Sequence, residues 1–282
     1  MKQREDMQNN PAQKFKASII IAFYNNTTAL ALVFSALEKQ TEKDFEVVIA
    51  DDGSNEESLQ TLQEMSQIST LNILHSWQED SGFRKNRCLN KAIQASHSDY
   101  LIFIDGDCIP QSHFIEDHLS EAQAGVCLNG RRADLSDKMT SLLRKSANPA
   151  KFIAENRYKM LHDYLLGNGK NIEKGFRITH PKLRKIIQKK NKGLVGCNFS
   201  LFKQDLLKIN AFDERYEAPG VGEDSDIDFR LRLAGITIKP LFYKAIQVHL
   251  YHKILPRSDV NEALFKQIQN EGKAWTNYGI KK

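Results

Sequence analysis

The stretch ASIIIAFYNNTTALALVFSALEKQTEKDFEVVIADDGS, residues 17–54, decides the fold. An apolar, β-branched run at 18–23 is typical of a buried strand, and apolar residues recur at helical spacing through 27–39. A second apolar run at 45–50 ends directly at the acidic sequence Asp-Asp-Gly-Ser. A strand, a helix and a second strand joined by short connections predict parallel strands with a right-handed crossover.

The same alternation continues along the chain to residue 104, and shorter elements are expected near the C-terminus. The further elements that we expect are a helix at 57–68, a strand at 71–75, a helix at 84–95, a strand at 100–104, a helix at 226–234, and strands at 237–241 and 245–249. No repeat or low-complexity linker interrupts the pattern. The sequence therefore predicts an α/β fold with a mostly parallel central sheet flanked by helices, in a single domain over 1–282.

Lysine and arginine are concentrated between Lys138 and Gly193, where 15 basic residues stand beside 3 acidic ones. The whole chain has a net charge of only +5, so the remainder of the chain is acidic. A basic, largely helical insertion of this kind indicates contact with an anionic surface, either a nucleic acid or a membrane, although a solvated helical face would have the same composition. Within 181–192 the apolar residues share one helical face, as in an interfacial helix: Leu183, Ile186 and Ile187. We therefore expect peripheral contact with an anionic membrane through 138–193.

Several classes of protein are excluded. The longest nearly apolar stretches, 17–24 and 29–37, are shorter than the roughly 18–20 residues that span a bilayer. The charged segment that precedes them is not a signal peptide, so we expect a cytoplasmic protein. Any contact with a membrane would then be on the cytoplasmic face of the inner membrane. The four cysteines form no CxxC pair, which predicts reduced and buried thiols. No GxxxxGK[ST], GxGxxG or GxSxG motif occurs, which argues against P-loop, dinucleotide-binding and α/β-hydrolase chemistry.

Two acidic motifs follow predicted strands, and the carboxyl ends of parallel strands form the edge where such sheets bind ligands. Asp105 and Asp107, separated by Gly106, are able to point into one site and to offer oxygen ligands to a hard divalent cation. Asp52 or Asp51 is placed to accept a hydrogen bond from a ribose hydroxyl or a base N–H. Taken alone, each motif would equally suit a turn or a helix cap.

Three further groups complete the candidate site. The GEDSD sequence at 222–226 places carboxylates in the first turn of a helix, where the helix dipole favours them. His249 and His252 follow a strand at i, i+3 spacing and offer imidazole ligands to a metal ion. Arg84 and Arg87 open a helix and are able to meet phosphate oxygens.

Seven segments between about Ala17 and His252 resemble, in the same order, the inverting family 2 glycosyltransferases of the GT-A fold. They are SIIIAFYN, VVIADDGS, WQEDSGFRKNRCLNKAI, YLIFIDGDCIP, GLVGCNFSLF, FDERYEAPGVGEDSDIDFRL and VHLYH. The FRKNRCLN and VGEDSDIDFRL sequences are most similar to bacterial polysaccharide-forming members and to the β-1,4-galactosyltransferase-like group.

The resemblance implies a role for each matching residue. Asp224 would be the general base, and Glu223 would bind the donor sugar or the acceptor. Gly196 to Ser200 would line the acceptor side. The residues that would bind the UDP-sugar donor are Phe23, Asn25, Asp51, Asp52, Arg84, Arg87, Asp105 and Gly106.

The resemblance also implies a metal site. Asp105 and Asp107 form the DxD motif and would hold Mn²⁺ or Mg²⁺ on the diphosphate of the donor. His252 and His249 would complete the metal shell.

The function implied by this resemblance is a metal-dependent inverting transfer of a hexose or N-acetylhexosamine from a UDP-sugar to a glycan or lipid-linked acceptor, in cell-surface polysaccharide synthesis. We divide the single domain into a nucleotide-sugar-binding half at 17–135, the basic helical insertion at 136–193, an acceptor and catalytic half at 194–252 and a helical tail at 253–282. No nucleic acid other than the donor nucleotide is expected as a partner.

Two alternatives stay open at this point. A sugar-nucleotide pyrophosphorylase shares a nucleotide-binding α/β core, but it would need a Gly-rich basic loop where Tyr24-Asn25-Asn26-Thr27 stands. A non-catalytic glycan- or nucleic-acid-binding protein would use the basic block instead of the acidic motifs.

Overall fold

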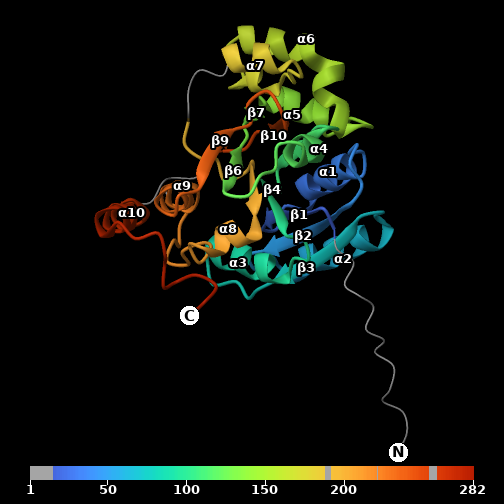
Figure 1. Cartoon of the computed structure of the whole chain (residues 1–282). Helices are drawn as coiled ribbons and strands as arrows, with labels where there is room; N and C mark the ends of the chain where they lie inside the picture. The colour runs from blue at the N-terminus through green and yellow to red at the C-terminus, as the bar shows by residue number, and fades with distance from the viewer. Residues whose placement is uncertain (1–14, 188–191, 221, 254–258) are drawn as a thin grey trace, which may run out of the picture.

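A seven-stranded sheet forms the centre of the computed structural model, which describes residues 15–187, 192–220, 222–253 and 259–282 (Figure 1). The strand order is β3-β2-β1-β4-β8-β6-β9. The strands are β1 (Ala17–Phe23), β2 (Phe45–Asp51), β3 (Asn72–Trp77), β4 (Tyr100–Asp105), β6 (Val126–Asn129), β8 (Phe199–Phe202) and β9 (Thr237–Pro240). β1 to β4 run parallel to one another, and β8 is antiparallel to both of its neighbours. The predicted α/β class with a mostly parallel central sheet is confirmed.

The central strands are apolar throughout because helices cover both faces of the sheet. Ile19 and Ile21 of β1 belong to one buried cluster and Ile20 to another, since successive side chains of a strand point to opposite faces. The first cluster includes Leu30 of α1 (Thr27–Leu37), and the second includes Leu89 of α3 (Lys85–Ala95). Two-sided burial explains why these strands read as continuous apolar runs.

The predicted elements up to residue 105 agree with the observed ones within two residues, including α2 (Glu56–Ile68). The main difference lies in the helix predicted at 226–234, which is α9 (Glu223–Leu233). Its first turn already contains Glu223 and Asp224, because carboxylates are favoured beside the free N–H groups of a helix start. The strand predicted at 245–249 is shorter than expected and forms β10 (Gln247–His249).

A second sheet of three short strands brings distant segments together at the edge of the first. β10 lies between β5 (Cys108–Pro110) and β7 (Arg132–Asp134). In this register His249 is paired with Cys108 on one side and with Asp134 on the other. The small sheet therefore fixes His249 next to the acidic loop that follows β4.

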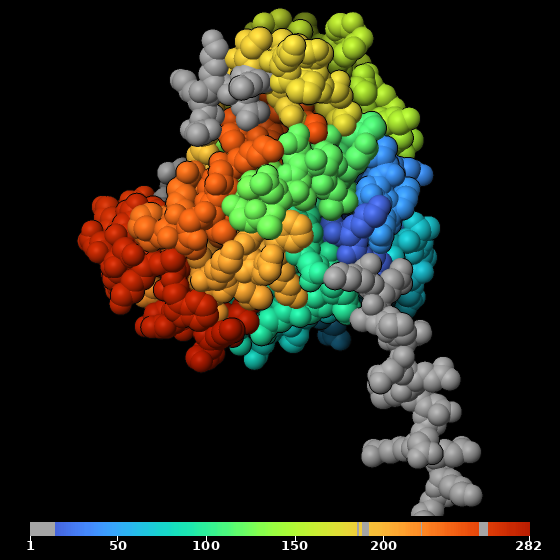
Figure 2. All heavy atoms as spheres, in the orientation of Figure 1, coloured from blue at the N-terminus to red at the C-terminus, as the bar shows by residue number. Residues whose placement is uncertain are grey.

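The basic segment is largely helical over the described residues, as predicted. It contains α5 (Asp137–Leu143), η1 (Pro149–Lys151), α6 (Phe152–Leu165), η2 (Ile172–Gly175) and α7 (Pro181–Ile187), while 188–191 lie outside the described residues. Phe152, Ile153 and Met160 of α6 belong to the same buried cluster as Ile19 and Ile21 of β1. Figure 1 shows α5, α6 and α7 at one end of the molecule, and Figure 2 shows their side chains forming the top of that view.

Three more helices complete the described structure: α4 (Phe114–Leu119), α8 (Lys203–Leu207) and α10 (Asp259–Glu271). The last of these lies within the predicted helical tail. None of the helices in the described ranges combines the length and the apolar character needed to cross a bilayer.

Candidate active site

A cleft of about 1400 Å³ opens at the carboxyl ends of the parallel strands. Members of each predicted acidic motif and both histidines lie on its wall, although they are up to 200 residues apart in the sequence. The lining residues with carboxylate, basic or imidazole side chains are Asp52, Asp80, Lys85, Asp105, Asp107, Arg132, Asp134, Asp137, Lys170, Glu223, Asp224, His249, His252 and Lys253. Carboxylates outnumber cationic side chains in this set, so a diphosphate would be repelled unless a cation accompanied it.

Asp107, His249 and His252 converge on one point of the cleft. The Nε2 atoms of the two histidines are 3.1 Å apart, and each lies 3.4 Å from Oδ2 of Asp107. Ligands about 2.1 Å from a common ion lie about 3.0–3.4 Å from one another in octahedral or tetrahedral geometry. The three atoms therefore fit a divalent cation.

Asp134 orients one of these histidines. Its Oδ1 atom lies 3.1 Å from Nδ1 of His249, which leaves the Nε2 atom directed toward Asp107. Burial acts to lower the pKa of His249, but Asp107 and Asp134 outweigh burial and raise this pKa to about 9. A carboxylate behind a ligating histidine is the usual outer-shell partner in metal sites. The sequence carries no signal for Asp134, which only the pairing of β7 with β10 reveals.

Asp105 is engaged differently from Asp107. Its Oδ1 atom lies 2.8 Å from Nζ of Lys85, and Nζ of Lys85 also lies 2.8 Å from Oε1 of Glu223. Burial acts to lower the pKa of Lys85, but the two carboxylates outweigh it and hold the pKa well above its ordinary value. Lys85 is thus a fixed cation between Asp105 and Glu223. It is not among the predicted site residues, which include its neighbours Arg84 and Arg87 instead.

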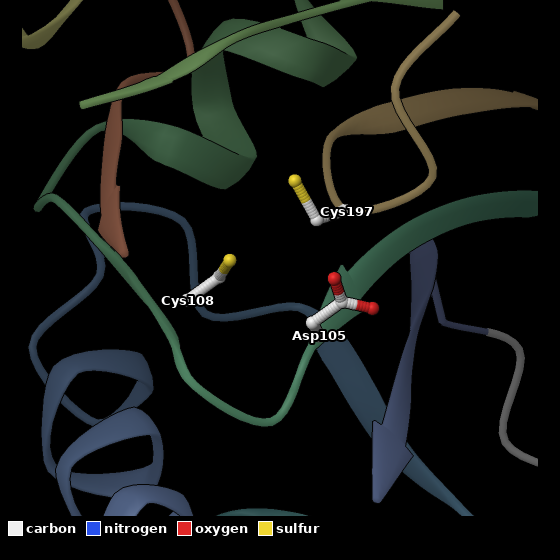
Figure 3. A group of neighbouring side chains, drawn as sticks. All are labelled: Asp105, Cys108 and Cys197. Carbon is white, nitrogen blue, oxygen red and sulfur yellow. The ribbon is translucent and has the colours of Figure 1, made fainter. Parts of the chain in front are cut away.

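Two thiols stand beside Asp105. Figure 3 shows Asp105, Cys108 and Cys197 around one space, and their ligand atoms lie within 4.8 Å of one another. Nη1 of Arg132 lies 3.5 Å from Sγ of Cys197, 3.9 Å from Sγ of Cys108 and 3.8 Å from Oδ2 of Asp105. A guanidinium at these distances opposes a second cation there. All four cysteines are buried, as predicted, and none takes part in a disulfide.

The two aspartates after β2 point in different directions. Asp52 lines the cleft, and its carboxylate accepts hydrogen bonds from the side chain of Gln78 at 2.7 Å and from the backbone N–H of Arg84 at 2.8 Å. Asp51 is fully buried, where it accepts from the backbone N–H of Ser54 and contacts His75 at 2.9 Å. Asp52 therefore faces the cleft, whereas Asp51 holds the turn.

The carboxylates at the start of α9 are also divided. Glu223 and Asp224 line the cleft beside Gly196, whose backbone N–H donates to Oδ2 of Asp224 at 3.4 Å. Burial raises the pKa of the Glu223 carboxyl against the opposing effect of Lys85. Asp226 lies in the core instead, in a buried ion pair with Arg230.

Several predicted donor-binding residues lie outside the lining of the cleft as the described chain forms it. Phe23 and Gly106 line the cleft, but Asn25, Asp51, Arg84 and Arg87 do not. Arg84 contacts Glu217 at 3.2 Å and reaches the site only through its backbone N–H on Asp52. The side chain of Asn25 accepts from the backbone N–H of Asn55. On the predicted acceptor side, Gly196 and Cys197 line the cleft, whereas the residues that follow them are buried.

Two sequence models of known families match the chain. The model of glycosyl transferase family 2 matches residues 18–208, which is more than half of the chain. The model of the N-terminal domain of galactosyltransferase matches residues 177–253, which include the start of α9 and both cleft histidines.

Among individual proteins, chondroitin synthase of Escherichia coli is 27% identical over 225 residues. The match covers 77% of this chain but only 32% of that protein, so the chain spans about a third of the length of this relative.

Two solved structures share the fold. S. aureus TarS matches with a TM-score of 0.56 at 19% identity, over 91% of this chain and 42% of that one, and it has also been solved with UDP-GlcNAc. The mannosyltransferase PcManGT from Pyrobaculum calidifontis, solved with GDP-Man and Mn²⁺, matches with a TM-score of 0.54 at 14% identity, over 86% of this chain and 59% of that one. The predicted GT-A-type fold is confirmed by these likenesses.

Proposed function

This chain belongs to glycosyl transferase family 2, and from this premise we propose that it transfers a hexose or N-acetylhexosamine from a UDP-sugar to a glycan or lipid-linked acceptor. The product would be a cell-surface polysaccharide. The observation that carries the proposal is the convergence of the Asp107–His249–His252 group and the Glu223–Asp224 pair on one acidic cleft. The relationship to chondroitin synthase supports polysaccharide synthesis as the setting.

The donor nucleotide would lie over the carboxyl ends of β1 and β2. Asp52 is the carboxylate that faces the cleft there, and Gln78 and the Arg84 backbone fix its orientation. A carboxylate held in this way is suited to accept from a ribose hydroxyl or from the uracil N–H. The complex of TarS with UDP-GlcNAc is consistent with a UDP-sugar donor.

Asp107, His249 and His252 would hold the divalent cation, with Asp105 on the diphosphate side. When bound, the ion would supply positive charge against the leaving diphosphate. Two imidazole ligands suit Mn²⁺ better than Mg²⁺, which prefers oxygen ligands. The Mn²⁺ complex of the mannosyltransferase is a precedent on this fold.

The protein residues perform the rest of the transfer. Asp224 would take the proton of the acceptor hydroxyl as that oxygen attacks the anomeric carbon, and the UDP group would leave on the opposite face with inversion. Glu223 would position the sugar, because Lys85 holds its carboxylate at the floor of the cleft. The backbone N–H of Gly196 orients the carboxylate of Asp224 toward the cleft.

The test is release of UDP from a panel of UDP-sugars in the presence of MnCl₂, with and without a glycan acceptor. We expect one or two donors to give acceptor-stimulated UDP release that EDTA abolishes. Asp224→Asn is the matched variant, because it should bind the donor and lack transfer. A protein that binds glycan but releases no UDP from any donor would be the non-catalytic alternative, and formation of UDP-sugar from UTP and a sugar phosphate would identify a pyrophosphorylase.

A further inference from the structure

Helix α7 presents an apolar face to the surroundings. Its Arg184 side is held against the protein, because the guanidinium lies 2.8 Å from a carboxylate oxygen of Glu121. Three aliphatic residues of the same helix are nevertheless well exposed: Leu183 at 48%, Ile186 at 63% and Ile187 at 42%. The helix is thus anchored to the protein through Arg184 while its aliphatic side chains stay accessible.

Helix α6 adds a second set of exposed apolar side chains. Its buried stripe contains Phe152, Ile153 and Met160, which join the core. The other side and the C-terminal end of the helix carry Tyr158, Leu161, Tyr164, Leu165 and Leu166. Leu165 and Leu166 are 75% and 63% exposed. Both helices lie at the same end of the molecule, so the exposed apolar side chains are concentrated there (Figure 1).

This apolar end is continuous with the cleft. The four residues directly after α6 and Leu166, at 167–170, line the cleft wall. Ser136 and Asp137, at the start of α5, line it as well. A surface bound by α6 would therefore lie next to the cleft.

The basic insertion at 138–193, which contains both helices, is strongly cationic at its surface. Its exposed basic residues in the described part of the chain are Lys138, Arg144, Lys145, Lys151, Arg157, Lys159, Lys170, Lys182 and Lys192. Its exposed acidic residues there are Glu155 and Glu173. Such a surface attracts an anionic partner and repels a second copy of itself. Exposed leucine and isoleucine side chains in turn need an apolar phase, which phosphate-rich nucleic acid does not offer.

We propose that α6 and α7 form a docking surface for an anionic lipid bilayer, with their apolar side chains at the level of the headgroups. The surface is defined as Tyr158, Leu161, Leu165, Leu166, Leu183, Ile186 and Ile187. Tyr158 is suited to this position, since its ring lies under the guanidinium of Arg157 at 4.8 Å and combines an apolar body with a polar end. Docking would bring the cleft to the membrane surface. An acceptor that reaches the cleft at this surface would be carried on a lipid, a step that rests on the proposed glycosyl transfer.

The test is flotation of the full chain with two kinds of vesicle, one of phosphatidylcholine alone and one in which about a third of the lipid is phosphatidylglycerol. We expect the bound fraction to be roughly tenfold higher on the anionic vesicles and to fall as salt is added. The double variant Leu165→Glu, Ile186→Glu should lose this binding. The matched control is Ile68→Glu, because Ile68 is 86% exposed and its helix, α2, lies away from this end of the molecule (Figure 1).

Equal binding to both kinds of vesicle, or unchanged binding of the double variant, would overturn the proposal. A concentration-dependent dimer that the double variant abolishes, seen by analytical ultracentrifugation, would assign the surface to self-association instead. Flotation needs no donor and no turnover, so its result stands apart from that of the proposed activity. UDP release with a water-soluble acceptor should be equal in the wild type and the double variant, because neither residue lines the cleft.

Discussion

Nζ of Lys85 lies 2.8 Å from Oε1 of Glu223, although the two residues are 138 positions apart in the chain. The same nitrogen lies 2.8 Å from Oδ1 of Asp105. One largely buried lysine thus joins the acidic loop after β4 to the first turn of α9. It compensates two carboxylates that burial would otherwise make costly to ionise.

Lys85→Met should weaken both the site and the fold. Two partly buried carboxylates lose their cation, so we expect the free energy of unfolding to fall by roughly 1–2 kcal/mol and kcat/KM for the donor to fall more than tenfold. Lys85→Arg should restore part of both. The matched control is Arg87→Met on the same helix, because Arg87 is exposed and lies outside the cleft lining. Urea unfolding and donor titrations measure the two effects, and a Lys85→Met enzyme with normal donor kinetics would contradict this role.

His252→Ala should reduce Mn²⁺ affinity without loss of stability. The side chain of His252 is 50% exposed, so its removal costs little packing, but it deletes one of the three converging ligand atoms.

Asp134→Asn should lower Mn²⁺ affinity by roughly 10–100-fold, because it removes the carboxylate that orients His249. Calorimetric titration of MnCl₂ in the presence of UDP measures both. The exposed His162 provides the control His162→Ala, and the assignment fails if that variant and His252→Ala bind Mn²⁺ alike.

Asp224→Asn and Asp226→Asn should fail in different ways. Asp224 lines the cleft, so we expect kcat to fall by roughly 10²–10⁴-fold with donor binding nearly unchanged. Asp226 is buried in an ion pair with Arg230, so its neutralisation should cost about 3–5 kcal/mol of stability instead. Turnover and thermal unfolding of the two variants separate these effects. Normal turnover in Asp224→Asn would place the base elsewhere in the cluster.

His118 should make the fold sensitive to acid. Burial lowers the pKa of this histidine from 6.5 to about 4, against the opposing effects of its hydrogen bond with Asn198 and of the nearby Asp117. Between these pH values the unfolded chain binds a proton that the folded chain excludes, so stability falls as the pH drops from about 6.5 to about 4. The expected loss is about 3 kcal/mol.

Urea unfolding at pH 7 and pH 5 should detect about 2 kcal/mol of this loss. Replacement of His118 by Gln should flatten the pH dependence, whereas replacement of the exposed His162 by Gln should leave it unchanged. An unchanged slope in the His118→Gln variant would assign the acid sensitivity to other groups.

The sequence by itself determined the central sheet and the edge at which the site lies. Apolar runs such as those of β1 and β4 are recognised as strands from their local pattern of apolar residues. A motif that comes directly at the end of such a strand, as Asp105 does, must lie at the carboxyl edge of the sheet. The same local logic identified the start of α9 as acidic. These features depend on neighbours within a few residues, so a single sequence is enough to predict them.

Only the tertiary structure decided which side chains meet. Asp51 and Asp52 are adjacent in sequence, yet one is buried against His75 and the other faces the cleft, because successive residues at a strand end point to opposite sides. In the same way, the rotation of α3 against the sheet decides that Lys85 lines the cleft and that Arg84 and Arg87 do not. The contact of His249 with Asp134 depends on the register of β7 with β10, strands more than a hundred residues apart. Register and rotation are set by packing of the whole core, which no local pattern in the sequence records.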